Sequence, residues 1–401
     1  MRTILAVCCF AVYAAGQGKL AVAARVDHID ERAKEPMVVE HPNGTLFVAG
    51  YGKPFGVRLW KSTDHGAAWT RVNKGSETDG AVGTSDVDLA ISRDGTLYFA
   101  ALDVDQEARV GRGVSIGVSN DTGSTWRWTR LSSQHTADRP WVAVAADGTA
   151  HVIWSEAAGV NYAVSRDHGG TWTQRPLIYE HGGSSHLAVG PRQEVAVRVT
   201  PLSGGGTKFD PGVDLIAVST DGGATWKTRP APGNREWSAS FSATKRWVEP
   251  LAWDSKGALY SFWADGKELW LARSIDKGET WASWKVDSGD DIAYYPYLVA
   301  RGRGELAATW FSGDGEATLS HIAKIDASGS AAPKLVEGPS FHPETWRPGA
   351  KPEDSPIRDA HAGGEYMPIT FLKAGGFAVV SSIIDLKAQR FGFTWWRLES
   401  R

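Results

Sequence analysis

The chain has 401 residues, of which 42% are hydrophobic and 22% are charged. This composition excludes a disordered or fibrous protein and allows a sizeable core. The formal net charge is −3 and no run of Lys or Arg occurs, so a nucleic acid is not an expected partner.

The first 24 residues are interpreted as a signal peptide. An apolar stretch over residues 4–15 follows a positive charge, and small residues predict cleavage between about residues 16 and 24. The stretch is too short to span a bilayer. Cys8 and Cys9 both lie inside it, so the mature chain would fold without disulfides. We therefore expect a secreted or periplasmic protein with no membrane span.

A short motif, Ser-x-Asp-x-Gly-x-x-Trp, occurs five times, and four copies carry Thr before the Trp. Successive copies are 46 to 57 residues apart. Such a period, combined with short strands, is typical of a β-propeller. We call these copies the five boxes, and they begin at Ser62, Ser119, Ser165, Ser219 and Ser274.

A looser repeat, a strand followed by a Gly turn and a second strand, occurs seven times between the turns at Gly44 and Gly376. Alternating apolar positions in these copies indicate half-buried strands. We predict an all-β fold in which residues 25–401 form one propeller of four-stranded antiparallel blades. Seven blades are expected, with six as the alternative because an insertion over residues 338–365 complicates the count. The seventh repeat lacks an outer strand, which residues 25–30 would supply, closing the ring.

The boxes resemble the Asp-box, or BNR, repeat of the sialidase-like superfamily of propellers. The resemblance covers nearly the whole mature chain and implies that each box is a hairpin between the third and fourth strands of a blade. The residue types suit a structural role: Asp167 can accept turn N–H groups, Gly169 can take a positive φ, and Trp172 can pack between sheets.

This strand order places the boxes and the Gly turns at one end of every blade, and the starts of the innermost strands at the other end. Charged and aromatic residues begin nearly every innermost strand and would converge on the axis, where we predict a functional site; a salt-bridged plug is the alternative. These residues are Lys34, Glu35, Asp86, Asp88, Asp138, Arg139, Ser185, His186, Arg246, Glu249, Tyr294, Tyr295, Glu365 and Tyr366.

The first functional hypothesis is a sialidase-like glycoside hydrolase. The resemblance implies arginines that grip a substrate carboxylate, a Tyr nucleophile activated by a Glu, and an acid for the leaving group. The family usually begins its first blade with Arg-Ile-Pro, whereas this chain has Lys34-Glu35-Pro36. The candidates are Arg139, Arg246 and Arg390 for the grip, Tyr295 or Tyr366 with Glu249 for the nucleophile pair, and Asp86 or Asp138 for the acid.

Two alternatives stay open. A polysaccharide lyase acting on uronate-containing glycans needs a His or Tyr base beside an Arg, and His186 is a candidate. A binding propeller needs exposed aromatic residues for glycan or protein contacts, and Trp237 is a candidate. A glycan is the expected partner under the leading hypothesis, and the protein is expected to be a monomer. No cofactor or metal is expected, because Asp103, Asp105 and Glu107 lack a full calcium-loop pattern.

Overall fold

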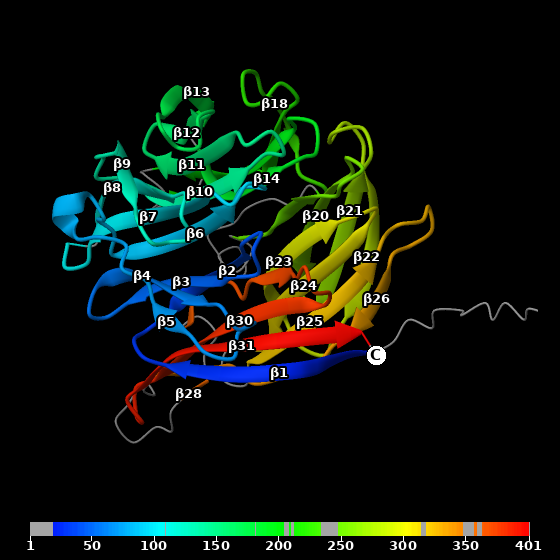
Figure 1. Cartoon of the computed structure of the whole chain (residues 1–401). Helices are drawn as coiled ribbons and strands as arrows, with labels where there is room; N and C mark the ends of the chain where they lie inside the picture. Colours follow the sequence, from blue (N-terminus) through cyan, green and yellow to red (C-terminus); the bar gives the residue numbers. More distant parts are fainter. Residues whose placement is uncertain are drawn as a thin grey trace, which may run out of the picture.

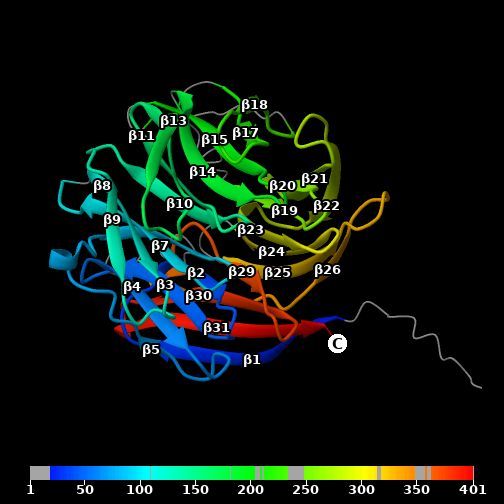
Figure 2. The ribbon, with the colours of Figure 1, turned by 45° about the horizontal axis from the view of Figure 1, so that its top comes forward.

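The computed structural model describes residues 19–108, 110–180, 182–203, 208–209, 212–233, 248–313, 318–347, 357–358 and 363–400. Its strands form seven sheets arranged in a ring (Figures 1 and 2), and the four strands that make up each blade are antiparallel. The seven-bladed propeller is therefore confirmed, and the six-bladed alternative is wrong. No helix in the described ranges is long and apolar enough to cross a membrane.

Blades 1 to 6 follow one another along the chain, and each uses its strands in sequence order. Blade 1 consists of β2(Lys34–Glu40), β3(Leu46–Gly52), β4(Gly56–Ser62) and β5(Thr70–Arg71). Blade 2 consists of β6(Ser85–Ile91), β7(Leu97–Asp105), β8(Val110–Ser119) and β9(Arg127–Ser132). Blade 3 consists of β10(Asp138–Val144), β11(Ala150–Glu156), β12(Gly159–Ser165) and β13(Thr173–Glu180). Blade 4 consists of β14(Gly182–Val189), β15(Val195–Ser203), β17(Leu215–Ser219) and β18(Lys227–Pro230), and β16(Lys208–Phe209) pairs with β15. Blade 5 consists of β19(Leu251–Trp253), β20(Leu259–Asp265), β21(Glu268–Ser274) and β22(Ala282–Ser288). Blade 6 consists of β23(Ala293–Arg301), β24(Glu305–Ser312), β25(Leu319–Asp326) and β26(Lys334–Glu337).

Blade 7 joins the two ends of the chain. Its strands β29(Ile369–Phe371), β30(Phe377–Asp385) and β31(Arg390–Ser400) come from the C-terminal part, and β1(Leu20–Ile29) pairs antiparallel with β31 as the outer strand (Figure 1). The predicted ring closure is confirmed. Two short strands, β27(Glu344–Arg347) and β28(Ile357–Arg358), extend the sheet on the other side, β27 running parallel to β30. Pairing begins at Leu20, upstream of the expected domain start at Arg25.

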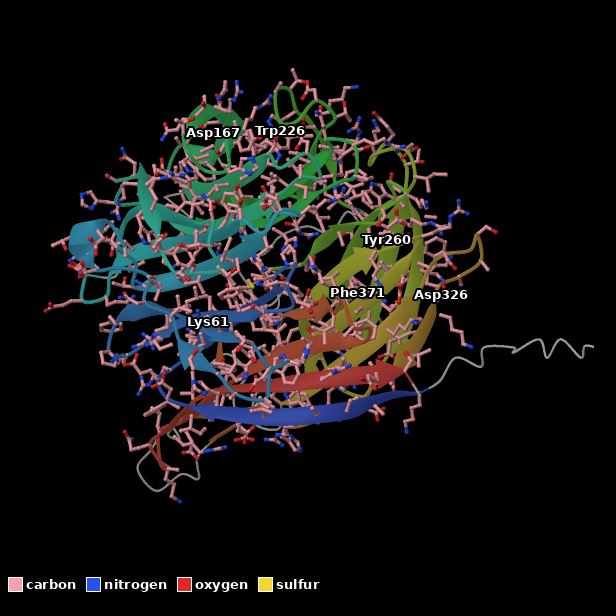
Figure 3. All side chains as sticks on the ribbon, in the orientation of Figure 1. Lys61, Asp167, Trp226, Tyr260, Asp326 and Phe371 are labelled. Atoms are coloured by element: carbon pink, nitrogen blue, oxygen red, sulfur yellow. The ribbon has the colours of Figure 1, made fainter. Side chains whose placement is uncertain are left out.

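The five boxes form one repeated hydrogen-bond pattern. In the third box, the Ser165 hydroxyl donates to Asp167 Oδ1 at 2.8 Å, and the Gly169 N–H donates to Ser165 Oγ at 2.9 Å. Asp167 also accepts the N–H and the hydroxyl of Thr171, both at 2.8 Å, and these bonds lower its pKa to about 2. The other boxes repeat this pattern, with Ala68 in place of the Thr in the first. Asp167 lies at the top of the view in Figure 3, and its contacts support the structural interpretation.

Two of the box tryptophans meet an aromatic ring of the neighbouring blade, as expected. Trp172 of blade 3 meets Tyr98 of blade 2 edge to face, and Trp226 of blade 4 meets Tyr162 of blade 3 in the same way. The first strands of consecutive blades contact one another all the way round the axis. Their starts therefore meet at the end of the ring opposite to the boxes, which is where the candidate residues lie.

Candidate active site

Five innermost strands shift register at their start, namely β2, β6, β10, β14 and β23. In β2, β10 and β23 the shift is a β-bulge that encloses two residues, the second of which is a proline. The first residue inside each bulge has a left-handed backbone, with φ of 46° at Glu35, 50° at Arg139 and 50° at Tyr295. Each of them precedes a proline. Left-handed non-glycine residues are uncommon, and bulges beside active sites re-aim side chains. The three blades thus use the same backbone device at the same place.

Four carboxyl groups and one guanidinium form what we call the axial cluster: Glu35 on β2, Asp86 on β6, Asp138 and Arg139 on β10, and Glu365 before β29. Arg139 Nη2 donates to Glu365 Oε2 at 3.0 Å, and its Nε lies 3.9 Å from Asp138 Oδ2. Burial acts to lower the pKa of Arg139, but the four surrounding carboxyl groups together raise it. Blades 1, 2, 3 and 7 all contribute a carboxyl to this one cation.

Glu35 is the most buried acid of the cluster. It is 6% exposed, the Tyr366 hydroxyl lies 3.4 Å from its Oε2, and Lys34 Nζ lies 3.9 Å from its Oε1. Burial and the negative charge of Asp86 raise the pKa of Glu35 to about 8. Burial and the nearby carboxyl groups raise the pKa of Tyr366 well above its ordinary value. Both groups are therefore protonated at neutral pH.

Asp138 is the more open acid. Its side chain is 34% exposed, against 8% for Glu35 and 18% for Glu365. Burial of the carboxyl and the charge of Asp86 raise the pKa of Asp138 to about 7, although the positive charge of Arg139 acts to lower it. A carboxylic acid that reaches solvent and still holds its proton near neutral pH is suited to donating that proton.

An aromatic layer lies directly below the cluster. Trp141 contacts the rings of His186 and Tyr366, and Tyr297 contacts the same two rings, with centroids 5.0 to 6.4 Å apart. Burial and the charge of Arg198 lower the pKa of His186 to about 4. His186, the candidate base of the lyase hypothesis, is a buried and neutral residue that packs in this layer.

Other predicted residues lie apart from this arrangement. Glu249 is fully buried and forms an ion pair with Arg198, which also pairs with Asp214. Arg390 lies on the third strand of blade 7, where it pairs with Asp27 and with Glu344 of β27.

Tyr294 is buried, and its hydroxyl lies 2.9 Å from Thr318 Oγ1. Lys34 stays at the edge of the cluster and lies over the ring of Tyr51. Arg246 and Trp237 fall outside the described residues.

The structure thus brings together six predicted residues, namely Glu35, Asp86, Asp138, Arg139, Tyr295 and Tyr366. The carboxyl of Glu365 and the phenol of Tyr51 were not assigned a role in advance. Burial and the charge of Glu35 raise the pKa of Tyr51. Tyr51 pairs in register with Lys34, so its position at the end of the second strand could have indicated it. The described residues contain no group of three or more His, Cys, Asp or Glu side chains arranged to hold a metal ion.

No family model and no curated protein matches the chain. Among solved structures, a PL25 ulvan lyase bound to a -[GlcA(1-4)Rha3S]- ligand is similar, with 11% identity, a TM-score of 0.58, and coverage of 94% of this chain and 96% of that one. An α-L-arabinanase from Penicillium chrysogenum in complex with arabinobiose has 13% identity, a TM-score of 0.51, and coverage of 94% and 98%. A microbial sialidase has 15% identity, a TM-score of 0.45, and coverage of 76% and 66%. At these identities the likeness to the first two shows a shared propeller fold.

Proposed function

We propose that the protein is an exported glycoside hydrolase whose reaction takes place at the axial cluster. One observation carries the proposal: burial, together with the negative charge of Asp86, raises the pKa of both Asp138 and Glu35. A carboxyl group that keeps its proton near neutral pH, together with a second carboxyl group, forms the usual catalytic pair of a glycosidase. Asp138 is the proton donor to the leaving oxygen, and Asp86 is the carboxylate that acts as nucleophile or as base for water.

The tyrosines suit a supporting role better than a nucleophilic one. A Tyr nucleophile needs a neighbouring carboxylate to take its proton. The neighbour of Tyr366 is Glu35, whose pKa is raised to about 8. Glu35 therefore holds its own proton at neutral pH and does not take one from Tyr366. This favours a pair of carboxyl groups over the Tyr–Glu pair implied by the sialidase resemblance. Tyr366 then keeps Glu35 in place through their mutual contact.

The charge of the cluster favours an uncharged sugar. Of its four carboxyl groups, Glu35 holds a proton at neutral pH, and the cation Arg139 is already engaged by Glu365. Binding a substrate carboxylate normally uses a free guanidinium fork. We infer a neutral glycan, for which the arabinanase with its bound arabinobiose provides a precedent on a similar fold.

The test is a screen of the purified mature protein on neutral polysaccharides, sialosides and uronate polymers. We expect new reducing ends from a neutral glycan. The value of kcat/KM should fall as the pH rises above the Asp138 pKa of about 7, because the acid then loses its proton. D138N and D86N should each lower kcat by at least about 100-fold. D147N, at an exposed acid in the Gly turn of the same blade, is the matched control and should keep full activity.

Other products would overturn the proposal. Sialoside cleavage abolished by Y366F would restore the tyrosine mechanism. An unsaturated uronate product, seen by its ultraviolet absorbance, would identify a lyase. Sugar binding without any product would identify a binding propeller.

A further inference from the structure

We propose that the face opposite to the axial cluster carries a second binding site, for a sulfate- or carboxylate-bearing glycan segment. A cavity of about 330 Å³ lies there among blades 4, 5 and 6. Four cationic side chains line it, and we call it the basic cavity: Arg192, Lys256, Arg273 and Arg303. This inference does not depend on the proposed hydrolase activity.

The fold itself gathers these cations. Arg192, Lys256 and Arg303 occupy the same structural position in successive blades, the turn between the first and second strands. Arg273 is the last but one residue of β21, which ends at the same face. Since all turns of this type meet at the end opposite to the axial cluster, side chains from three blades face one cavity.

The one acid in the lining does not neutralise the cations. Asp254 is 2% exposed and accepts the N–H groups of Lys256, Ala258 and Gly304 at 2.8, 3.0 and 2.9 Å. The hydroxyl of Tyr260, which is labelled in Figure 3, lies 3.1 Å from it as well. The carboxyl of Asp254 thus ties the turn of blade 5 to that of blade 6 and is shielded from a ligand.

The cations are partly held in position. Arg273 Nη1 donates to the carbonyl of Ala327 at 2.7 Å, and the guanidinium lies over the Trp284 ring. Arg192 packs so closely on Gly257 that a Cβ there would meet its Nη2 at 2.7 Å. Its Nε lies 3.5 Å from the buried Glu194, so this edge of the guanidinium is already engaged.

Two cations supply most of the excess charge. Lys256 and Arg303 are exposed, and in the described part of the chain neither forms an ion pair. Oxyanions such as sulfate and carboxylate are the groups that guanidinium and ammonium ions recognise. The cavity therefore provides several donors in a volume that suits a short oligosaccharide.

The rest of the lining favours a glycan over a nucleic acid. Ser328 and Ser330 offer polar groups to sugar hydroxyls, and Tyr260, the aromatic residue in the lining, is 1% exposed. Single-stranded nucleic acids are bound by stacking bases on exposed aromatic rings. A phosphate backbone would find the charges here but no such platform.

Isothermal titration with a heparin hexasaccharide at about 0.15 M ionic strength tests the site. Wild-type protein should bind it, and K256E/R303E should weaken binding at least about tenfold, because two attractive charges become repulsive. R127E/K227E reverses two exposed cations on outer strands and should bind as wild type does. Both variants should keep wild-type thermal unfolding, and their activity on any neutral substrate should be unchanged.

Three outcomes would overturn the proposal. The first is no binding by wild-type protein, and the second is equal weakening by both double variants. The third is single-stranded DNA of matched charge binding as tightly as the hexasaccharide and displacing it, which would identify a surface for polyanions in general. A neutral maltohexaose serves as the negative control in every titration.

Discussion

Replacing Asp88 by Asn should change how the stability of the protein depends on pH. Asp88 is 7% exposed and lies near Tyr297 and Tyr366 of the aromatic layer. Its Oδ1 accepts the N–H of Leu89 and its Oδ2 accepts the N–H of Val142 on the next blade, both at 2.8 Å. Burial raises its pKa from 3.8 to about 7 in spite of these two bonds.

The folded state therefore binds a proton at Asp88 more tightly than the unfolded state does. Stability from this group is fully present below pH 3.8 and is lost as the pH rises through about 7. Integrated between about pH 4.5 and pH 8, the loss is about 3 kcal/mol. Asn has no such proton, but its amide can accept only one of the two N–H groups, which costs about 1–3 kcal/mol at every pH.

Urea unfolding of wild-type protein and D88N at both pH values tests this reasoning. D88N should be less stable at pH 4.5, and the difference should shrink or change sign by pH 8. The slope of ΔG with denaturant concentration should stay equal for the two proteins. A stability difference that does not vary with pH would show that Asp88 is ionised in the folded protein throughout, and the argument from burial would be wrong.

Three further outcomes are expected. R198M removes the guanidinium that pairs with the buried Asp214 and Glu249 and should lower the free energy of unfolding by about 3–5 kcal/mol, whereas R127M at an exposed arginine should change it little; calorimetry measures both. D167A should lower the thermal midpoint by removing the box hydrogen bonds while leaving kcat/KM of the folded protein unchanged, and a folded variant without activity would contradict the structural role. Y366F removes the hydroxyl contact with Glu35 and should keep kcat within about tenfold of wild type, whereas a loss of several thousandfold would indicate a tyrosine nucleophile.

The fold could be predicted because its determinants are local and repeated. Each box closes its own hairpin through contacts within four residues, such as those of Asp167 with Ser165 and Thr171. A motif of this kind marks one place in each blade and so orients every strand of it. The seventh blade, without a box, was still recognised from its Gly turn, since the turn needs the positive φ found at Gly376.

The site could be predicted only in part, because its pairings join residues far apart in the chain. Strand order placed Glu35, Asp138 and Arg139 at one end of the axis, but no spacing in the sequence indicates that Arg139 pairs with Glu365, 226 residues away. The same lack of a local signal explains why Glu249 was predicted to activate a tyrosine nucleophile. Its partner Arg198 lies on the second strand of the preceding blade, and nothing at the strand starts points to it.

The axial cluster and the basic cavity place groups of opposite charge at the two ends of the propeller. Four carboxyl groups meet at the strand starts and are held there by bulged residues such as Glu35 and Arg139, whereas four cations meet at the opposite turns. An anionic polymer is attracted by the second face, whereas at the first face Arg139 is already engaged by Glu365. A neutral chain is excluded from neither face. If both proposals hold, the protein can stay attached to an acidic glycan through Arg192 and Arg303 while Asp86 and Asp138 cleave a neutral one. A neutral polymer that is covalently linked to an acidic one should then be cleaved faster than the free neutral polymer. K256E/R303E should abolish that gain without affecting hydrolysis of the free neutral chain.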